Sequence, residues 1–253
     1  MPRFGDKVVL VTGGSRGLGR SMVQGFAGEG AKLVIASRKE ENCVALAAEI
    51  EDAGGRAIGV GANTANTADL DALVEKAITA FGRVDLLINN AGNNISYGPL
   101  TDLSVEQFDK MIAINLRGPW YLASKMAPIM AEQGGGAVIN ILSVAALRAS
   151  AYNGFYAAAK SGLEVLTKVM AQEWADKNIR VNAIAPGPYR SDLVQSSIDN
   201  MPGFEQGMRD STLLKRIAEA DEILNPVFYL ATEKNTTGIT LVADGGYLAN
   251  SNL

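Results

Sequence analysis

The chain has 253 residues, of which 47% are hydrophobic and 20% are charged, a composition typical of a globular protein with a large core. Twenty-three basic and 27 acidic residues give a net charge of −4, which predicts no nucleic-acid partner. The chain has no histidine, which excludes Ser-His-Asp and Cys-His mechanisms, and its single cysteine, Cys43, excludes an internal disulfide and a cysteine metal cluster.

The chain carries no membrane or secretion pattern. No apolar run approaches the roughly 20 residues that a membrane helix needs. The segment MPRFGDKVVLVTGG enters an apolar strand at once and has no cleavable signal pattern. We therefore expect a cytoplasmic protein with no membrane partner.

Short apolar runs alternate with longer helical patterns along the chain. The runs are almost continuously apolar, as expected for strands that are covered on both faces. This alternation predicts an α/β fold with a doubly wound parallel sheet and helices on both faces. The predicted strands cover 7–12, 32–37, 56–61, 84–90, 136–143, 180–186 and 239–246. A helical pattern follows the first strand, and further helices are predicted over 39–53, 67–81, 104–131, 152–176 and 219–231.

The sequence predicts a single domain over 1–253, because it holds no linker, low-complexity segment or internal repeat. Residues 188–216 differ from the rest, since they are polar, carry Met201, Phe204 and Met208, and lack a strand pattern. We expect this segment to be an insertion that forms a lid over the ligand crevice.

The first predicted strand runs into the glycine-rich segment TGGSRGLG, residues 12–19, and then into a helical pattern. Gly13, Gly17 and Gly19 allow a tight turn in which backbone N–H groups approach a diphosphate closely. No Lys-Ser or Lys-Thr pair follows, which excludes a Walker loop. The alternative is a plain strand-to-helix turn, but the position after the first strand favours dinucleotide binding.

The end of the second predicted strand bears on which dinucleotide binds. A carboxylate there would bind the ribose 2′-hydroxyl of NAD, but the strand ends Ala36-Ser37-Arg38. Arg38 can pair with a 2′-phosphate and Arg16 can flank it, because guanidinium groups match phosphate geometry. The chemistry favours NADP(H) over NAD(H); the alternative is two solvated surface arginines.

Tyr156 and Lys160 stand four residues apart in a helical pattern, which places the phenol and the ammonium on one helix face. A free tyrosine has a pKa of about 10, but a nearby cation lowers this pKa and prepares the phenol for proton transfer. In a chain without histidine this pair is the best candidate for general acid/base chemistry. The alternative is a helix that buries a tyrosine and exposes a lysine.

Three further features lie at strand ends or inside a helix. Ser143 ends a predicted strand, where a hydroxyl can donate to a substrate oxygen. Asn89–Gly92 also follows a strand, where asparagine side chains can tie strand ends together. Pro119 predicts a kink that frees the carbonyl of Asn115, four residues earlier, for a water. The alternatives are a loop-starting serine, a stabilising turn and a kink made only for packing.

In this order and spacing, the motifs resemble those of the short-chain dehydrogenase/reductases over essentially the whole chain. The resemblance implies a Rossmann-like domain of about seven strands and reversible hydride transfer between a nicotinamide and a small-molecule ketone or alcohol. It also implies a homotetramer. The matching segments are TGGSRGLG at 12–19, NNAG at 89–92, Asn115, Ser143, Tyr156-x-x-x-Lys160, PGP at 186–188 and VADGG near the end.

By matched position, the resemblance implies that Tyr156 is the general acid/base and that Ser143 polarises the substrate oxygen. Lys160 would bind the nicotinamide ribose and lower the tyrosine pKa, and Asn115 would hold a water in a proton relay. The residues predicted to bind the cofactor are Gly13, Ser15, Arg16, Gly17, Leu18, Gly19, Ser37, Arg38, Asn63, Asn89, Ala91, Gly92, Tyr156, Lys160, Pro186, Gly187, Tyr189 and Ser191.

Two places depart from the family pattern. Asn63 stands where many relatives carry aspartate near the adenine. Tyr189 and Ser191 stand where a small aliphatic residue and threonine are common, and the bulk of Tyr189 puts the local loop geometry in doubt.

The substrate itself is left open by the sequence. We expect a pocket formed by 93–97, 144–147, 152–153 and the lid, with apolar side chains and with Arg148 and Arg190 either meeting an anionic group or exposed. A 3-oxoacyl thioester, a sugar-derived ketone, a steroid and a xenobiotic ketone all fit, and no metal is predicted. The alternative functions are a non-catalytic dinucleotide-binding or redox-sensing module and a methyltransferase.

Overall fold

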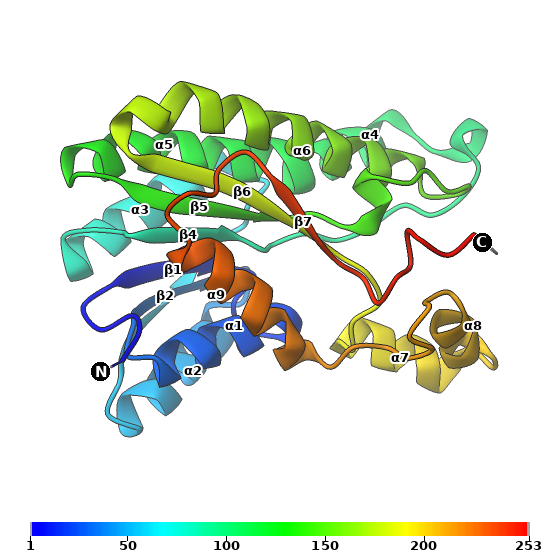
Figure 1. The fold of residues 1–253 in the computed structure, drawn as a ribbon, viewed down its shortest axis with the longest axis horizontal. Helices are drawn as coiled ribbons and strands as arrows, with labels where there is room; N and C mark the ends of the chain where they lie inside the picture. The colour runs from blue at the N-terminus through cyan, green and yellow to red at the C-terminus, as the bar shows by residue number, and fades with distance from the viewer. Residues whose placement is uncertain (1, 252–253) are drawn as a thin grey trace.

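The structure is a computed structural model that describes residues 2–251, without the side chains of residues 192, 193, 196 and 197. Met1, Asn252 and Leu253, which the predicted domain includes, lie outside the described residues. A single sheet of seven parallel strands, in the order β3-β2-β1-β4-β5-β6-β7, forms the centre of the fold (Figure 1). The predicted doubly wound, Rossmann-like parallel sheet is confirmed. The strands are β1 (Val8–Thr12), β2 (Lys32–Ser37), β3 (Arg56–Gly61), β4 (Leu86–Asn89), β5 (Gly136–Ile141), β6 (Ile179–Pro186) and β7 (Thr240–Ala243).

The central strand β1 divides the apolar core into two layers. Val9 and Val11 pack into one cluster, on the side of the sheet covered by α1, α2 and α9 (Figure 1). Val8 and Leu10 pack into a second cluster under α3, α5 and α6, because successive side chains of a strand point to opposite faces. Both faces are therefore buried, which explains the continuous apolar runs. The helices are α1 (Gly17–Gly28), α2 (Glu40–Asp52), α3 (Thr67–Phe81), α4 (Val105–Ile112), α5 (Gly118–Glu132), α6 (Gly154–Trp174) and α9 (Leu224–Thr232).

The long helix predicted over 104–131 is interrupted between α4 and α5. One wider turn, Ala113–Arg117, separates the two helices, and the N–H of Gly118 bonds the carbonyl of Ala113, five residues back. Pro119 has no N–H to donate to the carbonyl of Asn115, four residues earlier, which accounts for the wider turn. The distortion predicted at Asn115 is confirmed.

Residues 188–216 leave the sheet at the end of β6 and project to one side of the molecule as two short helices, α7 (Asp192–Asn200) and α8 (Phe204–Asp210) (Figure 1). Arg190 anchors the base of this segment. Its Nη2 lies 3.3 Å from Glu205 Oε1 and its Nε lies 3.3 Å from Glu219 Oε1. The segment is thus an insertion outside the sheet, held partly by charge.

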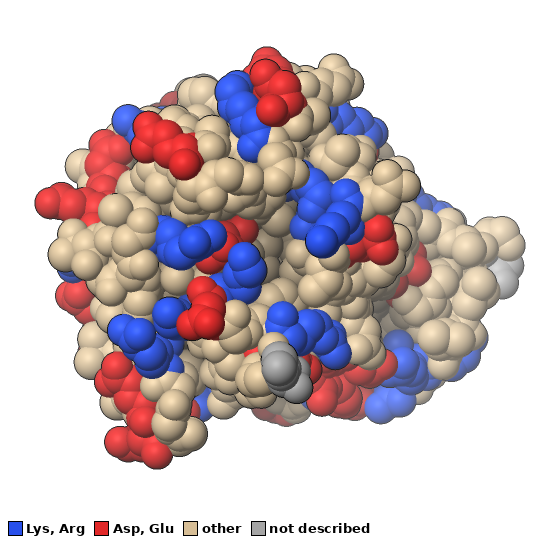
Figure 2. Space-filling model, turned by 60° about the vertical axis from the view of Figure 1, so that its left-hand side comes forward, with Lys and Arg blue, Asp and Glu red and all other residues tan. Residues whose placement is uncertain are grey.

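Charges of both signs are interspersed on the face of the molecule that Figure 2 shows, in keeping with the small net charge of −4. Within residues 2–251, no helix combines the length and the apolar character that crossing a bilayer would require.

Candidate active site

The glycine-rich segment forms a tight turn between β1 and α1. Gly13 adopts a left-handed backbone (φ +64°), and a Cβ there would lie 2.9 Å from Asn90 Nδ2. A Cβ on Gly19 would collide with the carbonyl oxygen of Gly13. At the start of α1, Arg16 makes no side-chain cap, so the N–H groups of the first turn stay available to an anion. These features fit the diphosphate of a dinucleotide.

Thr12 and Asn90 belong to the predicted segments 12–19 and 89–92 but were not predicted to bind the cofactor, and they hold this turn against the end of β4. Asn90 Nδ2 donates to the carbonyls of Thr12 (3.0 Å) and Gly13 (3.1 Å). Thr12 Oγ1 accepts from the backbone N–H groups of Asn90 and Ala91, both at 3.1 Å. The sequence signal for Asn90 is its position directly after a buried strand, next to Asn89, which was predicted to bind the cofactor.

Asn89 has a different environment from Asn90. It is buried, and its Nδ2 donates to the carbonyl of Pro119 (3.1 Å) and to Asn140 Oδ1 (2.9 Å). The side chain therefore ties β4 to β5 and to α5, which confirms that an asparagine here joins strand ends.

Two hydroxyl groups meet where the glycine turn approaches the end of β2. Ser15 Oγ donates to Ser37 Oγ at 3.0 Å, and Ser37 Oγ lies 3.0 Å from Cys43 Sγ. This contact brings the following residues, Arg16 and Arg38, to the same corner of the sheet. Both arginines are exposed, and neither forms an ion pair with another residue of the described chain. Two exposed guanidinium groups are thus available there for a phosphate, beside a pair of hydroxyls that bond each other.

Asn63, at the end of β3, is exposed and shapes its own turn. Its Oδ1 accepts from the N–H of Ala65 at 3.2 Å, and its backbone N–H donates to Asp69 Oδ2 at 2.9 Å.

Tyr156 and Lys160 share one face of α6, as their spacing predicts. Lys160 Nζ lies 5.7 Å from the centroid of the Tyr156 ring and donates to the carbonyl of Ile141 at 2.8 Å. Lys160 is only 2% exposed, and this burial lowers the pKa of its ammonium from 10.5 to about 8. Burial also raises the pKa of the Tyr156 phenol above 10.0, against the opposing effect of a hydrogen bond with Ser143.

The direction of the Tyr156 pKa differs from the sequence-based expectation that Lys160 would lower it. Desolvation disfavours the charged form of either group, so it favours a neutral phenol as well as a neutral amine. The sequence could not reveal this, because desolvation depends on the packing around α6. In the structure the phenol stays protonated, which is the form that a general acid needs.

Ser143 and Asn115 complete the predicted catalytic set from two other elements. Ser143, just beyond β5, accepts the N–H of Ala145 on its Oγ at 3.2 Å, which orients the hydroxyl. Asn115 is fully buried, and its side chain accepts the N–H of Asn93 (3.1 Å) and donates to the carbonyl of Asn93 (2.9 Å). The Asn115 side chain therefore fixes the loop after β4, while its carbonyl is the one that Pro119 leaves without an α-helical partner.

The loop after β4 begins directly against Lys160. A Cβ on Gly92 would lie 2.9 Å from Asn115 Oδ1 and 3.0 Å from Lys160 Nζ. The space beside the lysine therefore depends on this glycine.

The same loop then reaches the start of α6. Asn94 Nδ2 donates to Asn153 Oδ1 at 2.7 Å, and the N–H of Gly98 donates to the carbonyl of Tyr152 at 3.0 Å. The segments 93–97 and 152–153, which we predicted to face the substrate, are thus joined beside Tyr156.

The segment after β6 passes next to the glycine turn. A Cβ on Gly17 would lie 3.6 Å from Ser191 Cβ, and Ser191 Oγ accepts the N–H of Val194 at 3.3 Å. The N–H of Gly187, which follows Pro186 at the end of β6, donates to the carbonyl of Ala243 at 3.0 Å. Residues 186–191 therefore run from β7 to the glycine turn between β1 and α1.

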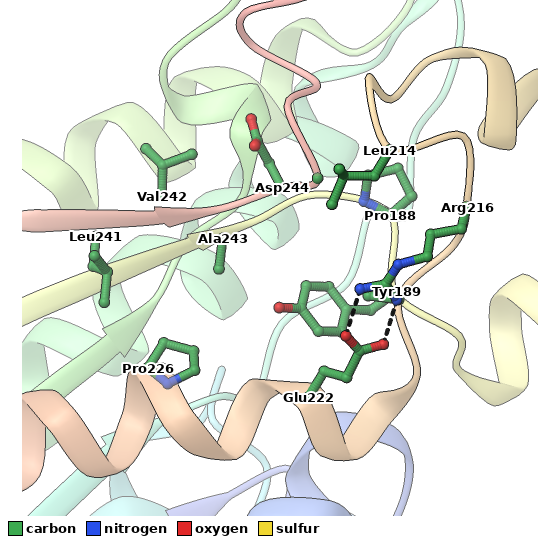
Figure 3. Close-up of a pocket in the computed structure, with 12 residues that line it drawn as sticks. Pro188, Tyr189, Leu214, Arg216, Glu222, Pro226, Leu241, Val242, Ala243 and Asp244 are labelled. Atoms are coloured by element: carbon green, nitrogen blue, oxygen red, sulfur yellow. Dashed lines mark hydrogen bonds and ion pairs between the residues drawn. The ribbon is translucent and has the colours of Figure 1, made fainter.

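Tyr189 is largely buried, and its ring points into a cavity of about 290 Å³ between β7 and the start of α9 (Figure 3). Beside the ring, Arg216 and Glu222 form a two-bond ion pair at 2.5 and 2.6 Å. The residues that line this cavity do not include Ser143, Tyr156 or Lys160. This cavity is therefore separate from the predicted catalytic residues.

The two arginines considered for an anionic substrate group are both engaged. Arg190 pairs with Glu205 and Glu219, as described above. Arg148 Nη1 donates to the carbonyl of Asn250 at 3.3 Å, and its guanidinium lies 6.0 Å from the centroid of the Tyr247 ring. Within residues 2–251, no group of three or more His, Cys, Asp or Glu side chains could hold a metal ion.

Comparisons with known proteins agree with this geometry. The family model described as short chain dehydrogenase matches residues 7–202. An L-rhamnose 1-dehydrogenase (NAD(P)(+)) of Azotobacter vinelandii is 36% identical over 97% of this chain and 98% of its own, and a levodione reductase of Leifsonia aquatica is 36% identical over 98% and 96%. The solved structure of a 7α-hydroxysteroid dehydrogenase with NADH and 7-oxo glycochenodeoxycholic acid superimposes with a TM-score of 0.91, at 31% identity over 96% of this chain and 95% of its own.

Proposed function

The chain belongs to the short-chain dehydrogenase family, and on that premise we propose that it transfers a hydride between NADP(H) and a ketone or secondary alcohol, with Tyr156 as the general acid/base. Membership makes it an oxidoreductase for alcohol or carbonyl substrates that uses a nicotinamide dinucleotide. One observation carries the finer proposal: the buried Lys160 ammonium lies 5.7 Å from the Tyr156 ring centroid, on a helix that faces the strand ends.

The dinucleotide, when bound, supplies or accepts the hydride. In the direction of reduction, Ser143 and Tyr156 donate hydrogen bonds to the carbonyl oxygen. Tyr156 transfers its proton to that oxygen as negative charge develops, so the carbon gains a hydride, the oxygen gains a proton and no free alkoxide forms. Lys160 stabilises the resulting phenolate until solvent restores the proton through the region of the Asn115 carbonyl. Oxidation runs the same steps in reverse.

The preference for NADP(H) rests on the corner formed by the glycine turn and β2. Arg16 and Arg38 offer two exposed guanidinium groups beside the bonded hydroxyls of Ser15 and Ser37. A 2′-phosphate has the charge and geometry for such donors. The backbone of Tyr189, rather than its ring, is the part that we assign to the cofactor, since the ring points into the cavity of Figure 3.

Three finer features belong to the same proposal. Residues 188–216 cover the substrate as a lid, because their base adjoins the glycine turn at Ser191. The buried single thiol of Cys43 suits the reducing cytoplasm. A homotetramer would cover the apolar side chains exposed on α4, α5 and α6, namely Val105, Phe108, Trp120, Val165 and Val169.

Tyr156→Phe tests the acid/base assignment directly. The variant keeps the ring and loses the proton, so we expect kcat to fall by at least about 100-fold while cofactor binding is retained. The measurement is NADPH oxidation over a panel of ketones, and the reverse reaction over alcohols, with cofactor affinity followed by fluorescence titration. Turnover comparable to the wild type would overturn the assignment. Tight cofactor binding by the wild type with no turnover of any substrate would favour a non-catalytic module.

A further inference from the structure

The orientation of the two amides beside Tyr156 is fixed by a single backbone donor. The N–H of Ser96 donates to Asn94 Oδ1 at 3.2 Å, so the NH₂ group of Asn94 faces Asn153. Asn153 therefore presents its Oδ1, which accepts at 2.7 Å. The NH₂ group of Asn153 points away from Asn94 and has no hydrogen-bond acceptor elsewhere in the described chain.

The residue that carries this donor group begins the helix of the proposed general acid/base. Asn153 directly precedes α6 and stands three residues before Tyr156. Residues three apart occupy one helix face, separated by roughly 4.5 Å along the axis. The residue that carries the two unused N–H donors thus stands about one helical turn before Tyr156.

Two exposed aromatic rings flank the same place. Tyr97 and Tyr152 are 74% and 53% exposed, and their ring centroids lie 6.1 Å apart at an interplanar angle of 47°. Tyr152 has a left-handed backbone (φ +66°), which bulky residues rarely adopt, and the N–H of Gly98 on its carbonyl supports this conformation. The fold therefore keeps a ring at the surface beside the amide of Asn153.

The charges around these groups are already paired. Arg190 is held by Glu205 and Glu219, and Arg148 is held against the segment that contains Tyr247 and Asn250. Neither arginine is left to recognise a carboxylate, a phosphate or an acyl thioester with an anionic carrier. This environment suits a substrate without charge.

Resting on the proposed function, we propose that the substrate is a neutral polyhydroxylated ring, a sugar or a cyclic polyol, whose hydroxyl groups accept from the Asn153 amide and whose C–H face packs on Tyr97 and Tyr152. An apolar ring would also pack on the tyrosines, but it would cover the Asn153 NH₂ group without pairing it, which is unfavourable. A polyhydroxylated ring satisfies both the amide and the aromatic rings. Asn153, Tyr97 and Tyr152 are then specificity residues for the reaction that Tyr156 performs.

The test compares neutral sugars and cyclic polyols with cyclohexanol, a ring with the same reacting group and no further hydroxyl. We expect the wild type to oxidise at least one neutral polyol with NADP⁺ or NAD⁺ at a kcat/KM at least tenfold above that for cyclohexanol. Equal or better use of cyclohexanol would overturn the substrate class while leaving the oxidoreductase proposal intact. Failure to oxidise or reduce any member of the panel, with either cofactor, would instead count against the proposed function.

Three variants, with a fourth as a control, test which residues recognise the substrate. Asn153→Asp keeps the acceptor for Asn94 and removes the donors, so KM for the polyol should rise about tenfold while the value for cyclohexanol changes less than threefold. Tyr97→Leu should raise KM for the polyol about fivefold, and Tyr97→Phe, which keeps the ring, should recover most of this loss. Tyr229→Leu, an exposed tyrosine on α9, is the matched control and should leave both substrates unaffected. A polyol KM that none of the Asn153 and Tyr97 variants moves would overturn the proposal.

Discussion

The ends of β1 and β4 lead into two loops that meet at Asn90 and Ala91, and the two loops are held in different ways. After β1, Asn90 Nδ2 donates to the carbonyls of Thr12 and Gly13, while Thr12 Oγ1 accepts the N–H groups of Asn90 and Ala91. After β4, residues 92–100 are held by side-chain amides from distant elements. This second loop also contains the hydroxyl of Ser96, which is buried without a hydrogen-bond partner in the described chain, and it supports the left-handed Tyr152.

The difference indicates which side of the site has fixed structural requirements and which side can vary with single substitutions. A turn that binds a diphosphate through its backbone N–H groups needs glycine at fixed positions, so its requirements are few and strict. A loop held by amide pairs and a strained tyrosine can change its shape with single substitutions. We expect variants in the glycine turn after β1 to act on cofactor binding and variants in 93–97, further along the loop after β4, to act on substrate selection.

Of the variants considered, Gly19→Ala should have the largest effect, a loss of cofactor binding at the turn after β1. The added Cβ would meet the carbonyl oxygen of Gly13, so the turn must open, and we expect the Kd for the dinucleotide to rise at least 1,000-fold, about 4 kcal/mol. Titration calorimetry measures the change, with the thermal midpoint as a check on folding. Gly28→Ala is the control, because a Cβ at Gly28, also on α1, meets nothing within 4 Å. Binding within tenfold of the wild type would show that the turn tolerates a side chain.

Lys160→Met tests the buried lysine on which the loop after β4 packs. The pKa of Lys160 falls from 10.5 in the unfolded chain to about 8 in the folded protein, which corresponds to about 3 kcal/mol. Between these values the unfolded state binds more protons, so wild-type stability rises with pH across this window. Below pH 8 the full cost of burying the charge is present, and methionine avoids it.

The stability difference between Lys160→Met and the wild type should therefore favour the variant most below pH 8 and should shrink toward pH 10.5, even though activity is lost. Urea unfolding at pH 7 and at pH 9.5 measures this difference. A gap that stays constant or widens as pH rises would contradict the lowered pKa. Lys168→Met, on the exposed side of α6 where Lys168 pairs with Glu164, is the control and should show no such trend.

Arg38→Asp tests the preference for NADPH over NADH that we propose for the corner formed by the glycine turn and β2. If a 2′-phosphate binds at the end of β2, KM for NADPH should rise about 10- to 100-fold, or roughly 1.4–2.7 kcal/mol, while KM for NADH changes little or falls. Steady-state kinetics with both cofactors measure the preference. Lys234→Asp makes the same change of charge at an exposed position between α9 and β7 and should not alter it. An unchanged NADPH/NADH ratio in Arg38→Asp would reject the phosphate role.

Asn94→Ala, in the loop after β4, should have the smallest effect of these variants. The substitution removes the bonds to Asn153 and to the N–H of Ser96, so we expect a loss of about 1 kcal/mol and a thermal midpoint lower by roughly 2–4 °C. Cofactor affinity should stay within twofold of the wild type. Asn42→Ala, at an exposed site on α2, is the control for calorimetry. A large loss of cofactor affinity in Asn94→Ala would mean that the two loops are not independent.

The sequence predicts the sheet well because buried parallel strands are continuous apolar runs, and β2 and β3 begin and end at the predicted residues. The shared face of Tyr156 and Lys160 follows from helical spacing alone. Other features depend on contacts between distant residues, such as the pair Asn94–Asn153, 59 positions apart, which leaves no local pattern.

Burial is the other property that the sequence does not carry. The Tyr156 pKa was expected to fall because a cation lies nearby, yet the packing of α6 against the sheet raises it. The helices α7 and α8 were also missed as helices, since short polar segments show no clear apolar periodicity. Cofactor roles for Asn63, Asn89 and the other predicted residues stay predictions.

The ion pairs of Arg190 with Glu205 and Glu219 make the insertion sensitive to ionic strength in a way that the sheet is not. These side chains are partly exposed, so added salt screens them, with a Debye length that falls from about 30 Å at 0.01 M to about 8 Å at 0.15 M. The apolar layers on either side of β1 keep their packing over the same range. Dilute buffer therefore holds α7 and α8 more tightly at their base than saline conditions do, whereas the sheet is held equally in both.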